Sequence, residues 1–352
     1  MSMAPWRLLF PLAALGGGLA PVIWLAGPLP VHLDARWHGH EMLFGFAGAV
    51  IGGFLVNGCT PGLAPALALS WLLARAAALC APSVPVALAG LAYPLLLAGL
   101  AGLPLWRSAR RLRNRFPPLV LAGLVVLDAL WWEGRLEGDV AMQDRSLFAT
   151  LSVLALLLLV MGGRALHTAV AGALDRAGLS RSGLRAASLE PLLGPLLLAA
   201  TACLAVGRSD WASGPLLLAG GLALWRLPWA HAPRLAADSR LATLAAGQCW
   251  VGVGLLLAAG SAWLETGMAI AAWHGLALGA LGTLTLVMMA RTAALRVRRP
   301  LTRFTDMALA TALVAVATIA RLAAPVAGEA APWLAASGWA LACLLLLRRL
   351  LG

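Results

Sequence analysis

The chain has 352 residues, of which 61% are hydrophobic and only 11% are charged. Soluble domains are about 45–50% apolar and about 25% charged, so the composition excludes an ordinary soluble protein. The 26 basic residues outnumber the 14 acidic ones. Membrane topology accounts for that excess, and we predict no nucleic-acid partner. The composition indicates an integral membrane protein whose main partner is the lipid bilayer.

Apolar runs of about 20 residues, the length that a helix needs to cross a membrane, recur along the whole chain. Glycine and proline mark most of the joints between them. We therefore predict an all-α polytopic bundle of about twelve transmembrane helices. The predicted spans are 8–29, 41–58, 62–81, 84–106, 117–133, 146–170, 189–207, 211–230, 241–264, 268–290, 304–326 and 332–347.

The arginines set the orientation of this bundle. With the N-terminus in the cytoplasm, 19 arginines fall on cytoplasmic segments, 4 fall in outer loops and 3 lie within spans. The positive-inside rule then predicts that both termini are cytoplasmic. No loop is long enough for a soluble domain, so residues 1–352 are expected to form a single membrane domain. A basic connector near 171–188 is where two halves, 1–170 and 189–352, would meet.

The motif W-H-G-H-E-M at 37–42 places two histidines and a glutamate at the outer end of the second span. If the segment is extended, His38 and His40 point the same way and suit one metal. If it is helical, residues two apart diverge by about 200°. Neutral imidazoles suit copper, iron or zinc, and the pair could also divide between a haem and a second metal. The alternative is interfacial histidines beside a belt tryptophan.

His274 favours a ligand role for this motif. It lies about six residues into the tenth span, on the same side of the membrane, at a depth of about 9 Å. An ionisable residue at that depth indicates a functional site. Both spans contain G-x-x-x-G, at 48–52 and 275–279, a pattern that lets two helices approach closely. We therefore expect the glycine faces to pack together and to bring His38, His40 and His274 into one outer pocket.

Four further ionisable residues fall within spans, where each must be paired, solvated or bound to an anionic group. These are Arg75, Asp128, Arg164 and Arg321. Haem propionates, substrate anions and structural salt bridges are the partners that the sequence leaves open.

At these residues the sequence resembles the NnrS family along most of its length. The most specific match is W-H-G-H-E-M-L-F-G-F at 37–46, and R-N-R-F-P at 113–117 is similar to the family's entry to the fifth span. G-G-R at 162–164 and the segment at 274–291 also resemble family elements, and Arg321 matches a late arginine.

The resemblance implies a twelve-span protein of the bacterial inner membrane that is linked to nitric oxide metabolism and resistance to nitrosative stress. It implies the cofactors haem and copper, with His38, His40 and His274 as ligands. The supporting residues would be Trp37, Glu41, Met42, Arg164, Arg291 and Arg321. A catalytic member would be a membrane oxidoreductase acting on nitric oxide or a related small nitrogen species.

This chain also departs from the family pattern. Ala245 stands where a histidine is usual, Gln248 where a tyrosine is usual, and Arg296 at a second histidine position. If a lost histidine is a haem ligand, this member carries fewer cofactors.

Two other functions compete with this interpretation. Twelve spans with buried arginines also suit a solute transporter, although discontinuous helices and symmetry between halves are not evident. An assembly protein could hold haem or metal without turnover. The optical spectrum and metal content of the purified protein would separate the three.

The topology can be tested with a reporter fused after Gly352. Because both termini are predicted to be cytoplasmic, a reporter that is active only in the cytoplasm should show activity when it is fused there. A fusion that is active only in the periplasm would contradict the predicted orientation.

Overall fold

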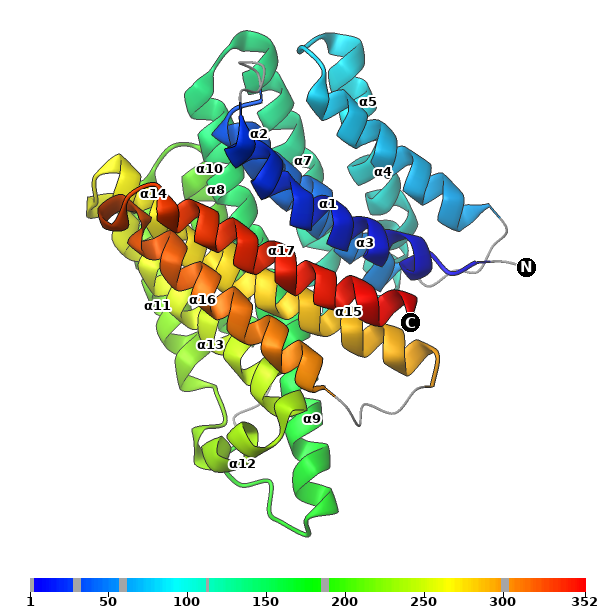
Figure 1. Ribbon diagram of the computed structural model, residues 1–352, viewed down its shortest axis with the longest axis vertical. Helices are drawn as coiled ribbons and strands as arrows, with labels where there is room; N and C mark the ends of the chain where they lie inside the picture. Colours follow the sequence, from blue (N-terminus) through cyan, green and yellow to red (C-terminus); the bar gives the residue numbers. More distant parts are fainter. Residues whose placement is uncertain (1–2, 28–32, 57–61, 112–113, 185–189, 299–303) are drawn as a thin grey trace.

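The computed structural model describes residues 3–27, 33–56, 62–111, 114–184, 190–298 and 304–352 (Figure 1). The described residues are 87% helical and include no strand. The predicted all-α helix bundle is therefore confirmed. Parts of the sequence predictions, namely Arg113 and the window ends at 28–29, 57–58 and 189, lie outside the described residues.

Every predicted span corresponds to a helix or to consecutive helices. The first half comprises α1 (Trp6–Ala26), α2 (Ala35–His40), η1 (Glu41–Ala47), α3 (Gly48–Leu55), α4 (Leu63–Leu79), α5 (Val84–Leu97), η2 (Ala98–Gly102), α6 (Leu103–Ser108), α7 (Phe116–Glu137), α8 (Val140–Leu157), η4 (Leu158–Gly162) and α9 (Gly163–Arg176). The second half comprises α10 (Glu190–Ala205), α11 (Ser209–Trp225), η6 (Trp229–His231), α12 (Ala232–Ala237), α13 (Ser239–Gly260), η7 (Ser261–Trp263), α14 (Thr266–His274), η8 (Gly275–Gly282), α15 (Thr283–Arg296), α16 (Thr305–Ala327) and α17 (Ala330–Leu351).

Among the described residues, eight helices are long and apolar enough to cross a membrane. They are Trp6–Ala26, Val84–Ser108, Phe116–Glu137, Val140–Arg176, Ser239–Trp263, Thr266–Arg296, Thr305–Ala327 and Ala330–Leu351. Shorter apolar helices cover Leu63–Leu79 and Pro191–Ala205. These helices make the chain a multi-pass membrane protein, while the number twelve and the cytoplasmic termini stay predictions.

Exposed tryptophans mark both ends of the bundle. At the predicted outer ends of their helices lie Trp211, Trp263 and Trp333, and at the predicted inner ends lie Trp106, Trp225 and Trp229. Tryptophan is enriched where a membrane meets water because its ring is apolar and its N–H is polar. The two groups therefore lie where the predicted topology requires interfaces.

The first and last helices close the bundle on each other. In Figure 1, α1 lies beside α17, and α17 lies beside α16. The indole N–H of Trp339 on α17 donates a 2.7 Å hydrogen bond to the carbonyl oxygen of Gly17 on α1. In the same view, α1 begins and α17 ends on the same side of the molecule. A chain that crosses the membrane an even number of times has both of its ends on the same side.

The expected contact between the glycine faces of the second and tenth spans is wrong. The second-span glycines admit side chains of α4 and α5, with Arg75 against Gly45 and Tyr93 against Gly48. In the tenth span, Gly275 faces Gly254 of α13, and Gly279 faces Trp250 of the same helix. A glycine groove accepts a bulky side chain as well as a second helix, so the pattern did not identify the partner.

Gly254 sets the distance between α13 and η8, the segment that directly follows His274. A Cβ atom on Gly254 would lie 2.6 Å from the backbone nitrogen of Leu276 and 2.8 Å from the carbonyl carbon of Gly275. Because backbone atoms cannot rotate away, Gly254→Ala should force the helices apart and destabilise the protein by about 1–3 kcal/mol.

Thermal unfolding of the purified protein in detergent measures this effect. Gly260→Ala is the matched control, since Gly260 ends the same helix and a Cβ there meets nothing within 4 Å. Equal melting temperatures for the two variants would contradict the close approach.

Candidate functional site

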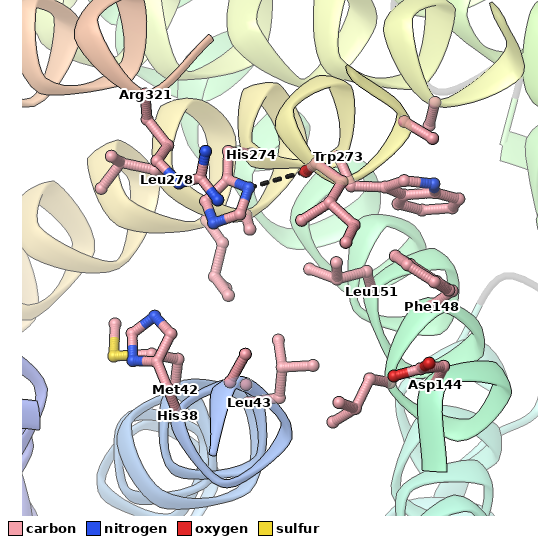
Figure 2. Close-up of a pocket in the computed structure, with 18 of the residues that line it drawn as sticks. His38, Met42, Leu43, Asp144, Phe148, Leu151, Trp273, His274, Leu278 and Arg321 are labelled. Carbon is pink, nitrogen blue, oxygen red and sulfur yellow. Dashed lines mark hydrogen bonds between the residues drawn. The ribbon is translucent and has the colours of Figure 1, made fainter. Parts of the chain in front are cut away.

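A cavity of about 580 Å³ lies between the segment with the W-H-G-H-E-M motif and the segment with His274. Figure 2 shows His38 and Met42 on one side of it, with His274 and Arg321 on the other. Aromatic and aliphatic side chains from α8 and α14, including Phe148 and Trp273, form much of the remaining wall. The volume lies within the range of small-molecule and cofactor sites, about 300–1,000 Å³.

His274 is the last residue of α14, and its ring is held by its own helix. Its Nδ1 lies 2.8 Å from the carbonyl oxygen of Ile270, one turn earlier, as the dashed line in Figure 2 marks. A carbonyl oxygen only accepts hydrogen bonds, so Nδ1 carries the proton in this contact. In the neutral ring Nε2 then keeps its lone pair. Histidines that bind metals are commonly oriented in this way.

His38 faces the cavity from the opposite wall. Its ring stacks on Trp24 of α1, with the ring centroids 5.0 Å apart and the planes 12° from parallel. Its Nδ1 is buried and has no hydrogen-bond partner in the described part of the chain. Because Nδ1 has almost no accessible surface, Nε2 is the ring nitrogen that a ligand in the cavity would reach.

His40 lies outside the cavity wall. Residues 35–40 are helical, so the rings of His38 and His40 point to different sides of α2. The Nε2 atom of His40 lies 2.8 Å from Oδ1 of Asp128 on α7, and its fully buried ring stacks on Trp131 at 3.8 Å. Of the two geometries that the sequence left open, the helical one is present.

Glu41 joins His40 to a buried arginine. One Glu41 carboxylate oxygen lies 3.6 Å from Nδ1 of His40 and 2.6 Å from Arg75 of α4. Asp128, His40, Glu41 and Arg75 thus form one buried polar group behind the cavity. Trp37 packs on the same side, in a cluster with Trp131 and Trp132. In this way Asp128 and Arg75, which the sequence left without partners, acquire them.

The exposed edge of the cavity carries an ion pair. Arg36 of α2 lies 2.9 Å from Asp144 of α8 and 2.7 Å from Asp34. Asp34 also begins α2, because its carboxylate accepts hydrogen bonds from the backbone N–H groups of Arg36 and Trp37. Neither Asp144 nor Trp24 was singled out from the sequence. A charged pair between distant segments leaves no local signal.

Both candidate ligand segments continue as π-helix. The stretch η1 follows His40, and η8 follows His274. Two carbonyl oxygens in and just after η1 accept side chains of neighbouring helices. Trp71 donates to the carbonyl oxygen of Gly45 at 2.8 Å, and Tyr93 donates to that of Gly48 at 2.9 Å. Isolated π-helical turns often mark functional sites.

Arg164 and Arg291 do not line the cavity. The Gly-Gly-Arg element that contains Arg164 has a packing role, since Gly162 lies against Gln248 and Gly163 lies against Arg226. Gln248, at a position where the family has tyrosine, accepts a 2.8 Å hydrogen bond from Arg226 and donates one to the carbonyl oxygen of Leu158.

Arg296, at a family histidine position, binds the end of α3. Its guanidinium donates to the carbonyl oxygens of Gly53 and Phe54 at 2.9 and 3.0 Å. Among the described residues, no group of three His, Cys, Asp or Glu side chains could hold a metal ion. The cavity therefore offers two histidines rather than three.

Together these features define a class: a polytopic helical membrane protein with a cavity that has a histidine on each of two facing walls. The family model described as NnrS protein matches residues 1–352, the whole chain. The chain belongs to the NnrS family, whose members are membrane proteins linked to nitric oxide metabolism. A search of curated proteins found no match.

The contact between Asp128 and His40 can be tested by two substitutions. Asp128→Ala leaves a buried imidazole without a partner and should destabilise the protein by about 1–3 kcal/mol. Asp128→Asn keeps an acceptor oxygen and should therefore lose less stability than Asp128→Ala. Thermal unfolding measures the difference, and equal losses would show that the hydrogen bond adds no stability.

Proposed function

We propose that this protein binds haem, copper or both in the cavity, and that it acts there on nitric oxide or a related small nitrogen species. His38 and His274 would be the ligands. The observation that carries the proposal is the pair of imidazoles on facing walls: no hydrogen bond within the described residues engages the His38 ring, and the bond from His274 Nδ1 to Ile270 leaves its Nε2 free.

The donor set fits the cofactors that the family implies. His38 and His274 would each supply an imidazole nitrogen to a haem held between the facing walls. Copper accepts imidazole nitrogen together with soft sulfur, and Met42 lines the cavity next to His38. A bound haem or copper would supply a redox-active metal that can bind nitric oxide.

The chain's own residues hold and shield this site. The Ile270 carbonyl orients His274, and the stack on Trp24 orients His38. Phe148, Trp273 and other apolar side chains make the cavity wall around the histidines largely apolar. An uncharged diatomic molecule enters such surroundings at little cost. This favours a small gaseous ligand over a hydrophilic transported solute.

His40 has a different role in this proposal from the one expected from its sequence. Its hydrogen bond to Asp128 occupies Nε2, and its ring lies outside the cavity wall. We therefore assign it, with Glu41, to holding α2 in place. A location in the bacterial inner membrane and a part in resistance to nitrosative stress complete the proposal.

Haem and copper content of the purified full-length protein tests the assignment. His38→Ala and His274→Ala should each lower cofactor content by at least about tenfold, because a lost metal ligand costs that much or more. His231→Ala is the control, since His231 contacts the carbonyl oxygen of Ser182 at 2.9 Å and does not line the cavity.

Undiminished content in both cavity variants would overturn the ligand assignment. A wild-type protein without haem or copper, prepared from cells supplied with both, would overturn the cofactor proposal. If the cofactor is present, the optical spectrum before and after addition of nitric oxide shows whether the gas binds. An unchanged spectrum would favour a protein that only holds the cofactor.

A further inference from the structure

Arg321 is a partly buried cation on the wall of the cavity. It lies on α16, six residues before the helix ends at Ala327, and thus about 9 Å below that end. Figure 2 shows its guanidinium beside His274, with His38 across the cavity. Its side chain therefore reaches the place where the candidate ligands face each other.

Four other arginines of the described helices have protein partners. Arg75 is paired with Glu41, Arg36 with Asp144, and Arg349 with Asp306. Arg135 donates to the carbonyl oxygens of Ala78 and Cys80. Arg321 has no carboxylate within salt-bridge distance and no hydrogen-bond acceptor in the described part of the chain.

The charged residues that line the cavity differ in whether they are paired. They are Arg36, Asp144 and Arg321. At the exposed edge Arg36 is paired with Asp144 and also with Asp34. The guanidinium of Arg321 remains as a single positive charge in largely apolar surroundings. Such a charge is unfavourable unless an anion compensates it.

We propose that Arg321 is an anion-binding subsite of the cavity that takes a planar oxygen anion, either a carboxylate or a small oxyanion. The guanidinium fork matches two oxygens of one such group and binds them through two parallel N–H···O bonds. The anion lies beside His274. It is either a propionate of a bound haem, in which case the inference rests on the proposed function, or a free ion such as nitrite.

Two probes distinguish these sources in the purified full-length protein. The first compares haem with haem dimethyl ester, whose propionates are uncharged. The wild type should bind haem at least about tenfold more tightly, and Arg321→Gln should remove the preference. The second is a calorimetric titration of cofactor-free protein with nitrite, where Arg321→Gln should weaken binding by about tenfold.

Arg349→Gln is the matched control, because Arg349 is also a helix arginine but lies away from the cavity. It should change neither result. Arg321→Lys keeps the charge without the fork and should retain part of the effect. If Arg321→Gln does not fold, the wild type and Arg321→Lys still decide the question.

A preference for haem over its ester identifies the propionate, and nitrite binding that depends on Arg321 identifies a free anion. Equal binding of both haems together with no nitrite binding overturns the subsite. If the protein takes up no haem at all, the haem part of the cofactor proposal fails, and the nitrite titration alone decides the role of Arg321.

Discussion

The hydrogen bond between His40 and Asp128 is the constraint on which the site depends. It joins α2 to α7 across 88 residues of sequence, and both side chains are fully buried. On a helix, side chains two residues apart diverge by about 200°. Once His40 is fixed against α7, His38 must point the opposite way, into the cavity. The second histidine of the motif therefore orients the first, and Glu41 with Arg75 completes the buried polar group behind it.

Side chains of α4 and α5 bind the backbone of the helix that carries the motif. A carbonyl oxygen has two lone pairs, so it can accept a side chain in addition to a bond within the helix. In η1 and at its end, the carbonyl oxygens of Gly45 and Gly48 accept Trp71 and Tyr93. Gly45 makes room for Arg75, and Gly52 makes room for Tyr93, because a Cβ at these positions would meet those side chains. The small residues of the motif thus have a packing role that also holds the histidine-bearing turn against α4 and α5.

The sequence predicted where the helices lie along the chain, but it did not predict which helices and side chains pack against one another. Apolar runs of membrane-spanning length are a local property, so the windows agree with the helices of the structure. The glycine pattern is also local, but it does not say whether a helix or a side chain fills the groove. Gly279 against Trp250 shows the second case. The partner of His40 and the ion pair of Arg36 with Asp144 depend on long-range packing. Neither could be inferred from spacing, although the presence of Asp128 within a span showed that it needed a partner.

The residues at which this chain departs from the family pattern lie outside the cavity. Ala245 on α13 and Arg296 on α15 occupy the two family histidine positions, and neither lines the cavity. Arg296 instead binds the last carbonyl oxygens of α3, where it joins the second and tenth spans near their ends. The loss of those histidines therefore leaves His38, His274 and Arg321 in place.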